Sequence, residues 1–452
     1  MSEQTMDLAI LNGQVIIPGS GVTKANVYVK DGKISALSGD VLPAKETIDA
    51  AGKYVAPGIF DPHTHIGLMQ PMAVEAKTEC GAALAGGVTT VGDFLGGPQS
   101  HFDSFPGIKK DIDAHAYTDV IPHLVIGTEQ QKSEMQRYIK ELGVRSFKVY
   151  LNGIPGLIPW VTDEFILGVF EEMKKSGERC MLCAHCENPG MVANAIAKMQ
   201  VAVPGEKMTL AKFADTHPPI VEAEAVQRIA KLAQYARQPV YIVHLFTKEG
   251  VRALEEIRQT NPYVNVETTS PYLVCNCDDP LGKALKMEPP FQGPDSQDAL
   301  WRGLELGLID TIGTDNVTLT AAEKKLSEEN FWNIFPGYTA VQHHMTAVLD
   351  EGTKRGIPIE KLITAMTKNP AEKFGVYPQK GSMFIGSDAD LVVFDMETEK
   401  AVKASEGTSR SDFSIYEGRC FRGWPVVTIK NGVVAAKDGK IVHEPLGKCI
   451  VR

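Results

Sequence analysis

The chain has 452 residues, of which 43% are hydrophobic and 23% charged, and its formal net charge is −10. This composition excludes a disordered chain, and the acidic balance disfavours nucleic acid or an anionic membrane surface as the main partner. No apolar run approaches the ~18 residues of a membrane span. The start of the sequence has no secretory signal, and eight cysteines are too few for a disulfide scaffold. We therefore expect a cytoplasmic protein without a membrane anchor.

Both ends of the chain carry short β-rich runs interrupted by turn dipeptides. These dipeptides are Asn12-Gly13, Asp31-Gly32, Asn431-Gly432 and Asp438-Gly439. Such pairs are strong hairpin signals, because both residues tolerate the positive φ that tight turns require. Neither end has enough strands for a stable sheet of its own. We expect one β-sandwich domain built from residues 1–53 and 376–452; the alternative is two unrelated hairpins packed on a common core.

Between residues 54 and 375, β-rich runs alternate with longer amphipathic segments. The predicted strands span residues 54–65, 89–95, 119–127, 146–151, 180–187, 241–246, 264–272 and 310–316. The predicted helices span residues 133–142, 163–176, 220–235, 248–259 and 296–306. Asp163 and Ser296 are predicted N-caps, and Gly177 and Gly307 are predicted helix ends.

Eight strands alternating with helices predict the α/β class, as a (β/α)₈ TIM-like barrel over residues 54–375. The alternative is an open, doubly wound sheet. That fold usually has a glycine-rich phosphate loop after its first strand, and the sequence has none there.

The first predicted barrel strand ends in His63 and His65, whose spacing points both rings to one side of a strand. Alone, His-x-His is a weak signal. Barrel active sites, however, lie at the C-terminal ends of the strands, and four further predicted strands end in a potential ligand. These residues are Lys148, His185, His244 and Asp315. Each alone has an ordinary structural explanation, but together they predict a metal site.

Lys148 needs a chemical explanation, because an ammonium group does not bind a divalent cation. A partly desolvated lysine beside metal-binding groups has a lowered pKa. Its neutral amine could add carbon dioxide and form a carbamate, an anionic group able to bridge two metals.

The run Cys180-x-x-Cys183-x-x-Cys186 resembles the spacing of an iron–sulfur or zinc site. On a strand, however, a three-residue spacing turns successive thiols to alternating faces. We expect buried, reduced thiols here and also at Cys275 and Cys277.

At these residues the sequence resembles the amidohydrolase superfamily, and within it the cyclic amidohydrolases: hydantoinase and dihydropyrimidinase, with allantoinase and dihydroorotase as cousins. The resemblance extends over essentially the whole chain. The matching motifs are Ala56-Pro-Gly-Ile-Phe-Asp-Pro-His-Thr-His65, Gly86-Gly-Val-Thr-Thr90, Ser146-Phe-Lys-Val-Tyr150, Pro218-Pro-x-x-Glu-Ala-Glu-Ala225, Glu267-Thr-Thr-Ser-Pro-Tyr272 and Lys380-Gly-x(4)-Gly-Ser-Asp-Ala-Asp-Leu391.

The resemblance implies two divalent metal ions, usually zinc. By resemblance, the first ion is held by His63, His65 and Asp315, and the second by His185 and His244. Carboxylated Lys148 and a hydroxide bridge the two ions. Relatives of this kind are commonly tetramers or dimers, so the resemblance also implies a homo-oligomer.

The residues expected around the substrate depart from the family pattern. Gly67 stands where dihydroorotases carry an arginine for the substrate carboxylate, and Gly153 stands where hydantoinases carry a tyrosine. The family's Ser-Pro-Pro-Leu-Arg segment reads Glu288-Pro-Pro-Phe-Gln292 here, and its Asp-His pair reads Asp315-Asn316. The resemblance therefore disfavours dihydroorotate and suggests an unusual ring. The candidate substrate contacts are Tyr150, Asn152, Glu288 and Asn316.

The function that these observations predict is hydrolysis of a cyclic amide, with Asp315 acting as base and then as acid. The substrate is expected to be a small hydantoin-like or dihydropyrimidine-like ring. The alternatives are an allantoinase, a cyclic imide hydrolase or a deaminase on the same scaffold, or a non-catalytic dihydropyrimidinase-like protein.

Overall fold

The computed structural model describes residues 5–153, 158 and 160–452. Eight parallel strands form one sheet in the order β13-β12-β11-β10-β9-β8-β7-β6. A parallel bridge from Thr64 to Asn316 joins the two outer strands of this sheet, so the barrel closes. The strands are β6 (Ile59–Thr64), β7 (Val88–Leu95), β8 (Asp119–Val125), β9 (Ser146–Tyr150), β10 (Met181–His185), β11 (Val240–Ile242), β12 (Val264–Thr269) and β13 (Thr311–Gly313). The predicted barrel fold is confirmed.

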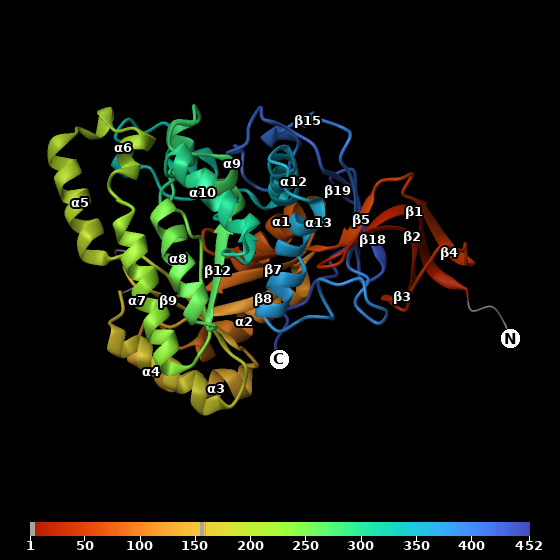
Figure 1. Ribbon diagram of the computed structural model, residues 1–452, viewed down its shortest axis with the longest axis horizontal. Coiled ribbons are helices and arrows are strands. Elements are labelled where there is room, and N and C mark those ends of the chain that lie inside the picture. The colour runs from red at the N-terminus through yellow and green to blue at the C-terminus, as the bar shows by residue number, and fades with distance from the viewer. Residues whose placement is uncertain (1–4, 154–157, 159) are drawn as a thin grey trace.

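Helices follow the strands and cover the outside of the barrel (Figure 1). The longer ones are α1 (Met72–Ala85), α2 (His101–His115), α3 (Glu129–Arg137), α4 (Asp163–Ser176), α5 (Pro189–Ala202), α7 (Ile220–Ala236), α8 (Lys248–Thr260), α10 (Pro294–Glu305) and α12 (His344–Lys354). The shorter ones are α6 (Leu210–Ala214), α9 (Ser270–Val274), α11 (Ala321–Lys324), α13 (Ile359–Ala365) and α14 (Lys368–Lys373). None of the helices in the described ranges is long and apolar enough to cross a membrane.

The two ends of the chain form a second sheet of nine strands, in the order β19-β18-β17-β14-β5-β1-β2-β3, with β4 paired to β1. Its longer strands are β1 (Met6–Ile17), β2 (Gly21–Lys30), β3 (Lys33–Ser38), β4 (Ala44–Asp49), β5 (Tyr54–Pro57), β14 (Leu391–Asp395), β17 (Trp424–Lys430) and β18 (Val433–Lys437). The last strand is β19 (Lys440–Ile441), and β15 (Lys400–Ala401) pairs with β16 (Cys420–Phe421) in a separate two-stranded sheet. The sheet encloses an apolar core of its own, which includes Val15, Val29 and Leu391. The composite sheet of both termini is therefore confirmed, and the division at residues 53 and 376 stays a prediction.

Several local predictions were wrong, including the N-caps Asp163 and Ser296. Residues 54–65 form two strands rather than one, and the break falls at Gly58, where a side chain would collide with Thr89. Asn12-Gly13 is a bulge inside β1 rather than a hairpin turn, although Asn12 does adopt a φ of 58°. The helix predicted over 133–142 begins four residues earlier, at Glu129, because the Thr128 side chain caps it there.

The predicted helix ends were more accurate than the predicted starts. Gly177 ends α4 in the left-handed conformation with a φ of 70°, and Gly307 follows α10 with a φ of 73°. The cap of α4, however, is the Thr162 side chain, which accepts from the amide of Phe165. Ser296 lies inside α10, which follows Gly293.

The barrel has an interior core distinct from the layer between strands and helices. Phe60, Phe94 and Phe374 belong to this interior core together with Cys183. Cys180 and Cys186 belong to the outer layer instead. The thiols therefore alternate across the sheet as predicted, and all three are buried and free.

Candidate metal centre

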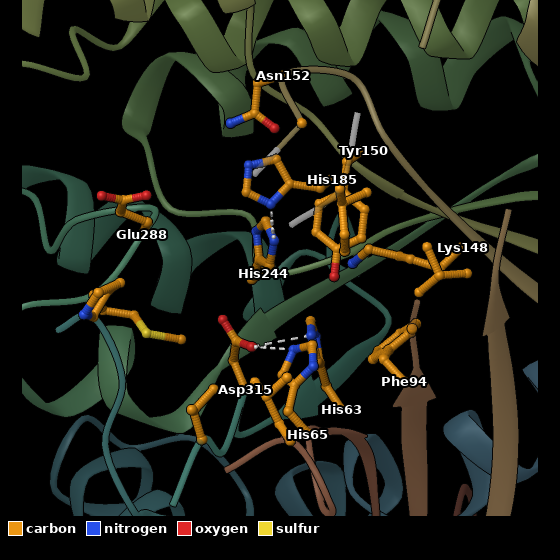
Figure 2. A pocket seen from close by; sticks show the side chains of 18 of the residues that line it. His63, His65, Phe94, Lys148, Tyr150, Asn152, His185, His244, Glu288 and Asp315 are labelled. Atoms are coloured by element: carbon orange, nitrogen blue, oxygen red, sulfur yellow. Dashed lines mark hydrogen bonds and ion pairs between the residues drawn. The ribbon is translucent and has the colours of Figure 1, made fainter. Parts of the chain in front are cut away.

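A cavity of about 190 Å³ lies at the C-terminal ends of the barrel strands. Polar side chains from five strands, or from the residues that follow them, reach this cavity (Figure 2): His63, His65, Lys148, His185, His244 and Asp315. The remaining wall is mostly apolar and includes Leu68, Phe94, Ile158, Met287 and Phe335. This combination of a few convergent polar groups and an apolar wall is typical of small-molecule sites.

His63, His65 and Asp315 form the first polar cluster. Asp315 Oδ1 lies 3.1 Å from His63 Nε2 and 3.1 Å from His65 Nε2. The three potential ligand atoms lie within 4.8 Å of one another. Burial opposes ionisation of Asp315, yet the two imidazoles hold its pKa well below the usual value. The cluster therefore offers two imidazole nitrogens and one carboxylate oxygen to a single point.

Glu267 at the end of β12 fixes the orientation of His63. One of its carboxylate oxygens lies 2.7 Å from His63 Nδ1, and the other accepts a hydrogen bond from Tyr241. With Nδ1 engaged by a carboxylate, Nε2 is left to face Asp315. Burial lowers the pKa of His63, but Asp315 and Glu267 outweigh it and raise that pKa to about 9. A histidine oriented by a carboxylate on its far nitrogen is the usual arrangement in metal sites.

His185 and His244 form the second polar cluster. His185 Nδ1 and His244 Nε2 face each other at 2.9 Å. The other nitrogen of His185 lies 2.7 Å from Glu187 Oε2, and Glu187 Oε1 lies 2.6 Å from His217 Nδ1. The His185 ring is thus oriented through Glu187, just as His63 is oriented through Glu267.

Two of these side chains reach the cavity from strained backbone. His244 lies just after β11 with a φ of 41°, and Asp315 lies just after β13 with a φ of 56°. Left-handed conformations in such residues cost on the order of 1–3 kcal/mol and concentrate at functional sites. A continuous strand could not present either side chain in this way, because its backbone is extended rather than left-handed.

Lys148 lies between the two clusters on β9 and is fully buried. Its Nζ has no hydrogen-bond partner among the described residues. It lies 4.4 Å from the ring centre of Phe94 and 4.9 Å from that of Tyr150. Burial lowers the pKa of Lys148 to about 8. An amine so easily deprotonated is a suitable nucleophile for carbon dioxide.

The donor set fits divalent metal ions. Imidazole and carboxylate ligands suit zinc and its neighbours. His63 Nε2 is buried without a well-directed hydrogen-bond partner among the described residues, and so is Lys148 Nζ. Buried polar groups are normally satisfied, so unpartnered atoms that converge on one cavity indicate a missing ligand.

The four predicted substrate contacts are placed differently. Tyr150, Asn152 and Glu288 line the cavity. Asn316 is outside its lining, and its Oδ1 accepts hydrogen bonds from the amides of Ala340 and Val341. The Asn316 amide thus holds the backbone after β13 rather than facing the cavity.

Sequence reasoning missed the residues behind the ligands, namely Glu187, Glu267 and His217. A signal for two of them was present, because Glu187 follows His185 by two residues and Glu267 is a carboxylate inside a predicted barrel strand. No sequence signal pointed to His217, since it lies before α7 and reaches Glu187 only through the fold.

The fold and these clusters define a closed α/β barrel with a candidate metal centre at its C-terminal end. The amidohydrolase family model matches residues 54–435, and the chain belongs to that family, which implies a centre of two divalent metal ions.

The similar proteins extend over nearly the whole chain. The L-hydantoinase of Paenarthrobacter aurescens is 30% identical over 97% of this chain and 96% of its own length. The D-hydantoinase of Ralstonia pickettii is 31% identical over 99% of both chains. The solved structure of L-hydantoinase (dihydropyrimidinase) from Arthrobacter aurescens has a TM-score of 0.92, at 28% identity and with coverage of 99% and 100%.

Proposed function

We propose that this protein is a metal-dependent hydrolase that opens cyclic amides by cleaving a ring C–N bond. The observation that carries the proposal is the convergence of four histidines, Asp315 and Lys148 on one cavity at the C-terminal end of the barrel. Relatives named L-hydantoinase and D-hydantoinase, similar over nearly the full chain, support the same reaction class.

In this proposal His63, His65 and Asp315 would hold one zinc ion, and His185 and His244 would hold a second. A carbamate on Lys148 and a hydroxide would complete the set of ligands. Divalent metal ions, when bound, polarise a carbonyl and make water a nucleophile near neutral pH. Glu267 and Glu187 keep the ring nitrogens of His63 and His185 directed at the cavity.

Asp315 is the residue proposed to move the proton. It is buried, and its Oδ1 is directed at the histidine cluster at the cavity floor. In the proposed reaction it accepts a proton from the attacking water and delivers it to the leaving ring nitrogen. Such acid–base work typically contributes ~10²–10⁴ in rate.

The substrate is held against the cavity walls. Tyr150 and Asn152 are the proposed polar contacts, and the Asn152 amide is oriented by its 3.0 Å hydrogen bond to Glu187. Asn316 was also a candidate contact, but nothing in its surroundings supports that role. We further propose a homo-oligomer, a dimer or tetramer, in the cytoplasm.

A substrate screen tests the proposed function. Metal-loaded protein is assayed for ring opening of hydantoins, dihydropyrimidines, allantoin, dihydroorotate and cyclic imides. We expect turnover of hydantoin-like or dihydropyrimidine-like rings and none of dihydroorotate, because Gly67 provides no cation for its carboxylate. Deamination without ring opening, or no turnover of any ring, would overturn the proposal.

A further inference from the structure

Glu288 is the one exposed residue of the otherwise buried segment 285–291, which borders the cavity. Residues 285–287 and 289–291 on either side of it are all buried, and Glu288 alone is exposed. Its side chain lines the cavity, on the side near Asn152 and His185 in Figure 2. A segment that buries its other side chains and directs one carboxylate at the cavity differs from an ordinary solvated loop.

The backbone around Glu288 is held by buried hydrogen bonds. Lys286 Nζ donates to three carbonyl oxygens, of Phe331, Trp332 and Ile334, at 3.1, 3.2 and 2.7 Å. Tyr272 donates to the carbonyl oxygen of Pro289 at 2.7 Å. These bonds fix the residues on both sides of Glu288, so the position of its carboxylate is set by the fold.

The carboxylate of Glu288 has no ion-pair partner among the residues that the structure describes. It forms no ion pair or hydrogen bond with another residue in the described part of the chain. Two basic groups that interact electrostatically with Glu288 have their direct bonds elsewhere, since Lys286 donates to carbonyls and His217 is bonded to Glu187. Burial opposes protonation of His217, but Glu187 and then Glu288 raise its pKa.

Apolar side chains make up much of the cavity lining besides Glu288. They include Leu68, Met287, Val317 and Phe335. A carboxylate among apolar side chains binds a hydrogen-bond donor or a cation more strongly than one in open water does.

We propose that Glu288 is a specificity-determining residue that selects cyclic amides bearing an amino or other cationic substituent. The inference rests on the proposed function and names its substrate class. The substituent's N–H groups take the place of the missing cation, while the ring amide lies at the metal centre. Rings with an aliphatic substituent of the same size leave Glu288 desolvated and unpaired, which costs transition-state stabilisation.

A matched substrate pair tests this inference on the metal-loaded enzyme. The kcat/KM values are measured for 5-(3-aminopropyl)hydantoin and for 5-butylhydantoin, which has the same number of non-hydrogen atoms. We expect the wild-type enzyme to prefer the amine by about 10- to 100-fold, the range for a hydrogen bond to a charged group. Glu288→Gln keeps the shape but removes the charge, and the preference should fall by most of that factor. Glu288→Ser should move it in the same direction.

The control variant is Glu329→Gln, which removes one exposed carboxylate from the segment that Lys286 holds but lies outside the cavity lining. It should leave the preference unchanged. A wild-type enzyme that opens both rings without favouring the amine, or a Glu288→Gln variant that keeps the wild-type ratio, would overturn the inference and leave the proposed function intact. Turnover of neither ring by the wild-type enzyme, with no ring opened in the substrate screen, would overturn the proposed function and this inference with it.

Discussion

The two ends of the barrel bury charged groups in opposite ways. At the N-terminal end, Lys430 Nζ lies 2.6 Å from Asp119 and 2.9 Å from Asp390. Lys380 lies 2.5 Å from Asp119 and 2.7 Å from Asp390. At the C-terminal end, Lys148 is as deeply buried but has no hydrogen-bond partner among the described residues.

This difference distinguishes buried lysines that stabilise the fold through ion pairs from a buried lysine that is available to a ligand. The Asp–Lys network connects the start of β8 to the sheet of the chain ends. Lys430 has two carboxylate partners, and Lys380 has a third in Asp388. The pairs of this network offset the cost of burial with one another. Lys148 has no such partner among the described residues, and a bound ligand is the simplest compensation. Four substitutions test this difference between the two ends of the barrel.

The largest effect is expected for Lys148→Ala. Without the side chain that we propose as a shared metal ligand, the protein should lose metal and its turnover should fall below detection. A short carboxylic acid added with zinc should restore part of the activity, because it can replace the carbamate. Metal content by elemental analysis and turnover are the readouts, and full metal with normal turnover would remove Lys148 from the site.

The next effect is expected for Asp315→Asn, which keeps the shape but cannot accept a proton. The kcat should fall by at least ~10²–10⁴, the usual worth of acid–base catalysis, while much of the metal remains. Steady-state kinetics beside metal analysis distinguish the two roles of Asp315. Activity within a few-fold of wild type would exclude it as the proton-transfer group.

At the other end of the barrel, Lys430→Met should destabilise the fold by about 3–5 kcal/mol, because it leaves Asp119 and Asp390 short of a cation. The matched control is Lys148→Met, which removes an amine without a partner and should cost little or even stabilise the metal-free protein. Urea unfolding of the metal-free proteins measures both. Equal losses of unfolding free energy would show that Lys148 and Lys430 contribute equally to stability, which would contradict the difference described above.

The smallest effect is expected for Glu267→Gln. The amide orients His63 less well than the carboxylate, so metal binding at the first cluster should weaken by about 10- to 100-fold. Competition with a chelator measures the affinity, and Glu329→Gln serves as a control for loss of charge. Unchanged affinity would make Glu267 a purely structural partner of Tyr241.

The barrel was predictable from the sequence because it follows from the periodicity of strands and helices, whereas the ligand set for two metal ions came from the family resemblance and stays a prediction. Strand ends meet at one end of a barrel, so His63, His185 and Asp315 could be placed together without a structure. The break at Gly58 was not predictable, because it depends on how close Thr89 approaches. The sequence also could not separate Glu288 from Asn316 as cavity residues, since their orientation is set by hydrogen bonds to distant loops.

Metal reconstitution tests whether the protein needs two metal ions to open a cyclic amide. Protein stripped of metal with a chelator is titrated with zinc, while ring opening of hydantoin and dihydrouracil is followed. We expect no turnover without metal and a turnover that rises with added zinc until about two ions are bound per chain, as in two-metal hydrolases. Full turnover by the stripped protein, or zinc bound to saturation with no ring opened, would contradict a metal-dependent ring-opening activity.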